Sequence, residues 1–86
     1  MNRTTRVVVE LSGDISSAMP RMKRLIKGCA YNPDAHLLAF RHKDMRLVVE
    51  PRRVIINGVK DEATARTVMD WLRGILNVAD AGNTGT

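Results

Sequence analysis

Two neighbouring apolar runs, Leu47-Val48-Val49 and Val54-Ile55-Ile56, constrain the fold of this chain more than any other feature. Both are rich in β-branched residues, which favour strands, and the tight connection at Pro51-Arg52 makes them neighbours in one sheet. Side chains alternate between the two faces of a strand, so both faces of this sheet carry apolar groups. Helices can cover one face, and a second apolar face is typical of an interface.

Length and composition indicate one small domain, which we place at residues 1–78, followed by a flexible tail at 79–86 (ADAGNTGT). The single cysteine excludes an intramolecular disulfide, and no apolar run approaches the ~20 residues of a membrane span. We therefore expect a cytoplasmic protein without a membrane partner. The formal net charge of +5 favours anionic partners, with nucleic acid first.

The rest of the chain reads as alternating strand and helix signals. Residues 6–11 form a β-branched strand, and an apolar stripe at Ile15, Met19, Met22 and Ile26 predicts a helix that stops near Gly28. Asp61 is a natural N-cap for a second helix. The buried stripe of that helix is predicted at Ala65, Val68, Leu72 and Ile75. Between the helices we expect a turn at residues 31–34 and strands at 35–42, 45–50 and 53–57.

This order predicts an α+β fold, β-α-β-β-β-α, in which an antiparallel sheet carries both helices on one face. Alternation along the strands then divides the apolar side chains between the two faces. We expect Val48, Val54 and Ile56 to meet the helices. On the opposite side, an open face is predicted at Leu47, Val49, Ile55 and Asn57.

The order of motifs from residue 31 to residue 76 resembles one repeat of the TATA-box-binding protein. The shared features are YNP at 31–33, the LVV strand at 47–49, and NG at 57–58 followed by Lys60 and an acidic helix start. The resemblance implies a curved antiparallel sheet with two helices on its convex side. It also implies that the concave side lies on the minor groove of DNA, where apolar wedges open base steps.

The resemblance also implies roles for individual residues. Leu47 stands where the family has a leucine, and Val49 and His36 stand where it has two wedge phenylalanines. Ile55 and Asn57 occupy the places of a valine and a threonine that touch base edges. Because the family binds DNA with two repeats and this chain has one, the resemblance implies a homodimer, formed through the sheet or its edge.

Basic residues gather around the predicted hairpins, notably Arg41, Arg46 and Arg53. They can reach phosphates beside an apolar sheet, or they can be ordinary solubilising charges of turns. A second basic group lies on the outer side of the first helix at Arg21, Lys23, Arg24 and Lys27. An ordinary solvated face explains that group, and an anionic or protein partner is the alternative.

The sequence contains no recognisable catalytic set, zinc-ligand spacing or phosphate-binding glycine loop, so we expect neither an enzyme nor a cofactor. Our first hypothesis is a module that binds DNA or RNA through the open face of its sheet, as a homodimer. The alternative is an assembly module whose open face is covered by a protein partner. The charge and the resemblance favour the first hypothesis, and the absent wedge phenylalanines favour the second. An enzyme with an unrecognised site ranks last.

Overall fold

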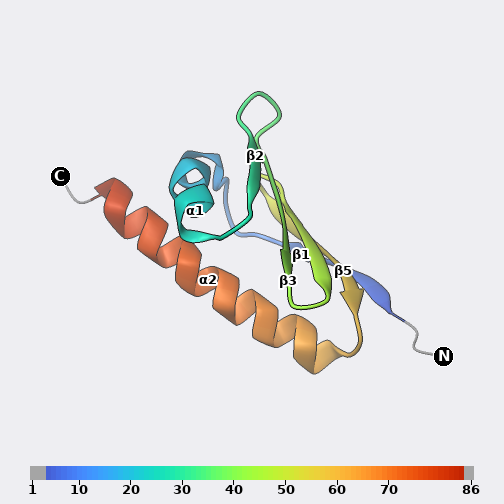
Figure 1. Cartoon of the computed structure of the whole chain (residues 1–86). Helices are drawn as coiled ribbons and strands as arrows, with labels where there is room; N and C mark the ends of the chain where they lie inside the picture. The colour runs from blue at the N-terminus through green and yellow to red at the C-terminus, as the bar shows by residue number, and fades with distance from the viewer. Residues whose placement is uncertain (1–3, 85–86) are drawn as a thin grey trace.

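The computed structural model describes residues 4–84, with side chains as far as Ala79. The chain forms an α+β domain with a five-stranded antiparallel sheet and two α-helices (Figure 1). A short 3₁₀ turn, Ser16–Ala18, leads into the first helix. The elements are β1 (Thr5–Glu10), α1 (Met19–Leu25), β2 (Ala30–Asn32), β3 (Leu37–His42), β4 (Met45–Val49), β5 (Arg53–Val59) and α2 (Glu62–Thr84).

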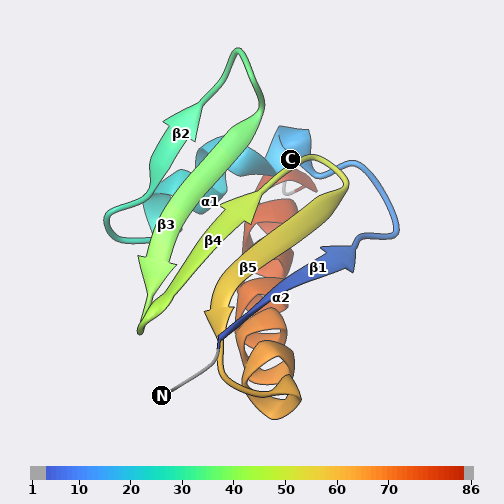
Figure 2. The same ribbon diagram turned by 90° about the vertical axis from the view of Figure 1, so that its right-hand side faces the viewer.

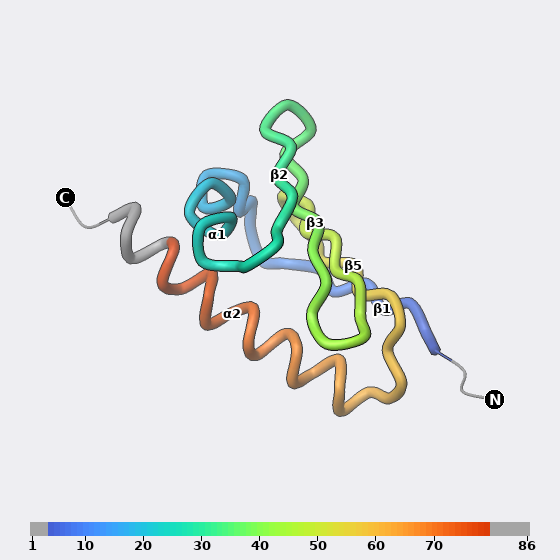
Figure 3. The backbone as a smooth tube through the Cα atoms, viewed as in Figure 1, coloured from blue at the N-terminus to red at the C-terminus, as the bar shows by residue number. Residues whose placement is uncertain are grey.

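The strands lie in the order β1-β5-β4-β3-β2, so the last four form a meander and β1 is added beside β5 (Figure 2). The expected element order lacked β2, a three-residue edge strand that pairs with β3. The predicted turn at residues 31–34 is wrong in its first two residues, which belong to β2, and the turn spans residues 33–36. The side-chain oxygen of Asn32 holds this turn, because it accepts hydrogen bonds from the backbone N–H groups of Asp34 and Ala35 at 3.0 and 3.1 Å. The backbone path of this protruding hairpin is seen in Figure 3.

Both helices lie on the same side of the sheet, as predicted (Figures 1 and 2). Apolar side chains from the sheet and from both helices form one core, and this burial is the main favourable term in folding. The fully or almost fully buried members from the strands are Leu38, Phe40, Met45, Leu47, Val49, Val54, Ile56 and Val59. The helical layer adds Ala18, Met19, Met22, Ile26, Ala65, Val68, Met69, Leu72 and Ala79.

Local signals account for where α2 begins. The Asp61 carboxylate accepts hydrogen bonds from the backbone N–H and the hydroxyl of Thr64, both at 2.7 Å, which confirms it as the N-cap. The predicted stripe is buried at Ala65, Val68 and Leu72 and half-buried at Ile75. The helix continues to Thr84 and buries Ala79, so the described part of the segment that was predicted as a flexible tail at 79–86 belongs to α2. Residues 85–86 of that tail lie outside the described residues.

Helix α1 is shorter than its apolar stripe. It ends at Leu25, while Ile26 is already extended with φ −105° and ψ 116°. Ile26 nevertheless stays buried, and its N–H donates to the Met22 carbonyl at 3.0 Å. Gly28 has a φ of 70°, a backbone conformation that favours glycine, and it turns the chain into β2.

Candidate functional site

The side of the sheet opposite both helices, which we call the open face, carries a row of small apolar side chains across all five strands. The strand register places Ala30 opposite Ala39 and Ala39 opposite Val48. The row continues because Val48 lies opposite Ile55, and Ile55 lies opposite Val8. We call these five residues the aliphatic row. Val8 at its β1 end is 48% exposed, whereas the central Ile55 is 8% exposed.

One side of the aliphatic row is basic. Arg41 of β3 and Arg46 of β4 are directly opposite each other, and both are exposed. Asn57 of β5 lies opposite Arg46 and continues this row. Neither arginine has an ion-pair partner among the residues that the structure describes. Like charges directly opposite on neighbouring strands destabilise a sheet, so a cation pair of this kind is poised to accept an anion.

The other side of the aliphatic row has balanced charges. Arg53 lies opposite Glu10, and its Nε donates to the Glu50 carboxylate at 2.7 Å. This hydrogen bond and the charge of Glu50 raise the pKa of Arg53 above its ordinary value. Arg53 therefore already has a carboxylate partner and is less suited to phosphate than Arg41 and Arg46.

The prediction for strand β4 is wrong by one residue. Leu47 and Val49 have no exposed surface and pack in the core, while Val48 lies on the open face. In β5 the prediction is confirmed, since Ile55 and Asn57 are on the open face and Val54 and Ile56 are in the core. The signal that could have prevented the error is Arg46, because a charged residue next to Leu47 must face water and its neighbours must then face the core.

His36, which was predicted to lie on the open face, is outside the sheet. The expected strand at 35–42 begins at Leu37, and His36 lies in the exposed turn between β2 and β3 with a φ of 54°. A positive φ is uncommon outside glycine, and asparagine, aspartate and histidine are the residues that adopt it most readily. The structure therefore assigns His36 a turn position instead of a wedge position on the binding face.

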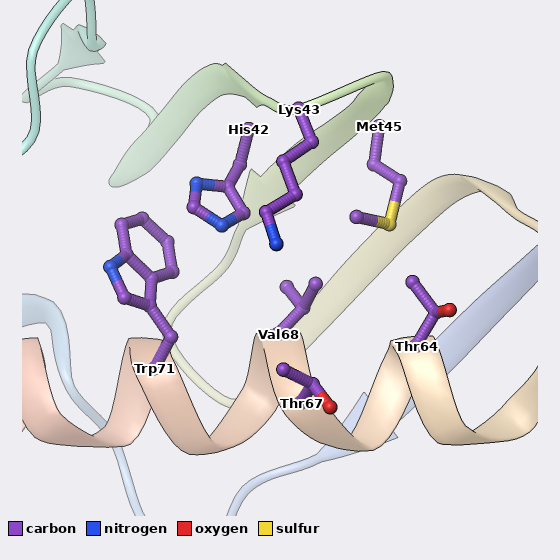
Figure 4. Close-up of a pocket in the computed structure, with 7 residues that line it drawn as sticks. All are labelled: His42, Lys43, Met45, Thr64, Thr67, Val68 and Trp71. Carbon is purple, nitrogen blue, oxygen red and sulfur yellow. The ribbon is translucent and has the colours of Figure 1, made fainter.

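A concavity of ≈ 490 Å³, which the sequence did not reveal, lies between the β3–β4 hairpin and α2 (Figure 4). One wall is a stack of His42 on Trp71, with ring centroids 4.0 Å apart, and Phe40 meets the same indole edge-on at 5.9 Å. Burial lowers the pKa of His42 below its usual 6.5, and the nearby Lys43 lowers it further. His42 is therefore neutral at pH 7.

Other chemistry is not evident in the described residues. They contain no group of three or more histidine, cysteine, aspartate or glutamate side chains that could hold a metal ion. Burial raises the pKa of the half-buried Cys29 thiol, which disfavours a reactive thiolate. No helix in the described part of the chain is long and apolar enough to cross a membrane.

Comparison with protein-family models, with curated proteins and with solved structures gave no match. The class that the fold defines is an α+β domain with an open antiparallel sheet.

Proposed function

We propose that this chain is a non-enzymatic nucleic-acid-binding module that places the open face of its sheet on duplex DNA. The observation that carries the proposal is the cross-strand pair of Arg41 and Arg46 beside the aliphatic row, for which the described residues provide no carboxylate partner. A phosphate between the two guanidinium groups relieves their repulsion and adds charge-assisted hydrogen bonds. The general kind of fold, an antiparallel sheet with both helices on one side, agrees with the resemblance to a repeat of the TATA-box-binding protein.

The composition of the aliphatic row determines how this domain would recognise DNA. Its side chains are alanine, valine and isoleucine, which make close contact with sugars and groove walls but offer no ring to stack on a base. Asn57, next to Arg46 in the sheet, is the neutral hydrogen-bonding side chain in position to meet a base edge. We therefore expect binding that depends on phosphate contacts and groove shape, with little discrimination between sequences.

A homodimer extends this surface. Among the described strands β1 has β5 as its one neighbour, so the backbone N–H and C=O groups along its other edge have no strand partner there. Its exposed residues include Thr5, Arg6, Val8 and Glu10. We propose that a second copy pairs along this edge, which would join two open faces into one surface. Sedimentation equilibrium, over a range of concentrations, measures the self-association directly.

The test of DNA binding is a salt series read by fluorescence anisotropy of a labelled duplex. The logarithm of affinity should fall linearly with the logarithm of salt concentration, and Arg41→Gln or Arg46→Gln should each reduce the slope by about 1. Arg24→Gln and Lys27→Gln are matched controls, since both residues are exposed near α1 and removal of either gives the same change in net charge. Equal losses in the two sets would mean that charge alone, without this face, causes binding.

The alternative function is an assembly module whose open face is covered by another protein. The observation in its favour is Val8, a large apolar side chain that is 48% exposed at the end of the aliphatic row. Association of this kind is driven by apolar burial, so it should tolerate or strengthen with a salting-out salt such as sulfate. DNA binding should instead weaken, so the same salt series separates the two functions.

A further inference from the structure

The concavity between the β3–β4 hairpin and α2 has the composition of a small-molecule site. Its volume of ≈ 490 Å³ falls within the range of roughly 300–1,000 Å³ that is typical of ligand pockets. Met45 and Val68 form its floor, with only 4% and 2% of their surface exposed, and the stack of His42 on Trp71 supplies an aromatic wall (Figure 4). A thioether sulfur and an aromatic side chain both make favourable contacts with the flat ring of a ligand.

Lys43 is the one fixed charge among the residues that line this concavity. Its side chain descends from the hairpin turn toward α2, and its ammonium lies between the side chains of His42 and Met45 (Figure 4). No ion pair joins it to a carboxylate of the described residues. A cation beside an apolar surface favours a ligand that combines one anionic group with an apolar portion.

The backbone at Lys43 is a second, independent observation. Lys43 is the first residue of the two-residue turn between His42 and Met45, and its φ is 57°. Glycine is the residue favoured at this position of a hairpin turn, and a lysine there carries backbone strain. Strain of this kind is concentrated at active sites and ligand-binding sites.

The threonine hydroxyl groups on the helix side are not available to donate a hydrogen bond to an anion. The Thr64 hydroxyl donates to the Asp61 carboxylate at 2.7 Å, and the Thr67 hydroxyl donates to the Ala63 carbonyl at 3.0 Å. Both hydroxyl hydrogens are therefore in use, and their oxygens can only accept. Lys43 is the cation of the lining, so we expect an anionic ligand group at the Lys43 end, with its apolar part toward Val68 and Trp71.

We propose that this concavity binds a small aromatic carboxylate, with its carboxylate on the Lys43 ammonium and its ring against Met45, Val68 and the His42–Trp71 stack. The site is on the helix side of the sheet, so it is separate from the open face. The proposal stands whether or not that face binds DNA.

Trp71 is the single tryptophan of the chain, so its fluorescence reports directly on this site. Phenylacetate is the probe, phenylacetamide is its neutral counterpart, and cyclohexylacetate keeps the charge without the aromatic ring. Phenylacetate should change the fluorescence saturably, and phenylacetamide should bind at least about tenfold more weakly because the charge-assisted bond to Lys43 is lost. Cyclohexylacetate should bind with intermediate affinity.

Lys43→Gly removes the cation and relieves the backbone strain in one step. Binding of phenylacetate should weaken at least about tenfold while the midpoint of thermal unfolding rises, so unfolding cannot explain the loss. Lys60→Ala is the control, since Lys60 is an exposed lysine outside the concavity and its removal changes the net charge equally.

Three results would overturn the proposal. The first is equal affinity for phenylacetate and phenylacetamide, which would remove the role of the charge. The second is unchanged phenylacetate binding in Lys43→Gly. The third is no saturable change with any of the three probes, both in Trp71 fluorescence and in ligand-observed NMR.

Discussion

The imidazole of His42 lies nearly flat against the indole of Trp71, with ring centroids 4.0 Å apart and an angle of 18° between the ring planes. The contact joins β3 to α2, two elements that are distant in the chain. Because burial lowers the pKa of His42, the folded protein holds this ring neutral more strongly than the unfolded chain does. A group of this kind adds stability above its unfolded pKa and loses it as the pH falls through the folded value.

We therefore expect the stability of the protein to decline as the pH falls below the ordinary histidine value of 6.5. His42→Phe keeps a ring against Trp71 without a titratable group, and it should remove this part of the decline. The measurement is urea unfolding at a series of pH values. His36→Asn is the control, because His36 is exposed in a turn with positive φ that asparagine tolerates. A decline below pH 6.5 in His42→Phe that is as steep as in the parent protein would contradict the prediction.

Two neighbouring substitutions in β4 test which face of the strand each residue occupies. Val49 has no exposed surface, so Val49→Lys places an unpaired charge in the core and should cost roughly 3–5 kcal/mol or more. Val48→Lys lies on the open face and should leave the domain folded, as read by circular dichroism and urea unfolding. An unfolded Val48→Lys variant beside a folded Val49→Lys variant would reverse the register.

The end of α1 offers a similar contrast between adjacent residues. Ile26 is 5% exposed and Leu25 is 48% exposed, although both are large aliphatic side chains. Ile26→Ala should lower the free energy of unfolding by roughly 2–5 kcal/mol, because it leaves a cavity between the layers. Leu25→Ala and Arg24→Ala should each change it by less than about 0.5 kcal/mol. Comparable losses at Ile26 and Leu25 would be inconsistent with the packing described.

Lys43→Gly should stabilise the domain by about 1 kcal/mol, since glycine adopts a φ of 57° without strain. The neighbouring turn residue Asp44 has no positive φ, so Asp44→Gly provides the matched comparison. That variant should lose stability, because glycine only adds conformational freedom to the unfolded chain there. Thermal and urea unfolding of both variants give the comparison, and a loss of stability in Lys43→Gly would argue against strain at the turn.

Asp61, the N-cap of α2, makes the stability of the protein depend on pH in the acid range. Its hydrogen bonds with Thr64 lower the pKa of the carboxyl below the ordinary 3.8. The charged cap therefore stabilises the fold above that pH, and this contribution is lost as the pH falls through the lowered folded value. Asp61→Ala should be less stable than the parent at neutral pH, and the difference should shrink in acid. Asp61→Asn keeps the acceptor and should stay close to the parent at neutral pH.

Local chemistry was sufficient to predict much of this fold. The Asp61 cap, the Asn32 turn and the buried stripes of both helices depend on residues only a few positions apart, so their spacing along the chain predicts them. The same holds for β5, where Arg53 faces water and places Val54 and Ile56 in the core. The arginine pair was also visible as two basic residues that flank a hairpin.

Features that depend on contacts between distant segments could not be found in this way. The run Leu47-Val48-Val49 has no internal alternation, so only the neighbouring Arg46 indicates its orientation in the sequence. The structure fixes that orientation through the two-residue turn that pairs His42 with Met45 and through the pairing with β5. Strand β2 forms because its residues pair with the edge of β3. The ring of His42 meets Trp71 only after the sheet and α2 have packed. A one-residue change in strand pairing exchanges every side chain between faces, and that pairing is settled by which face the helices cover.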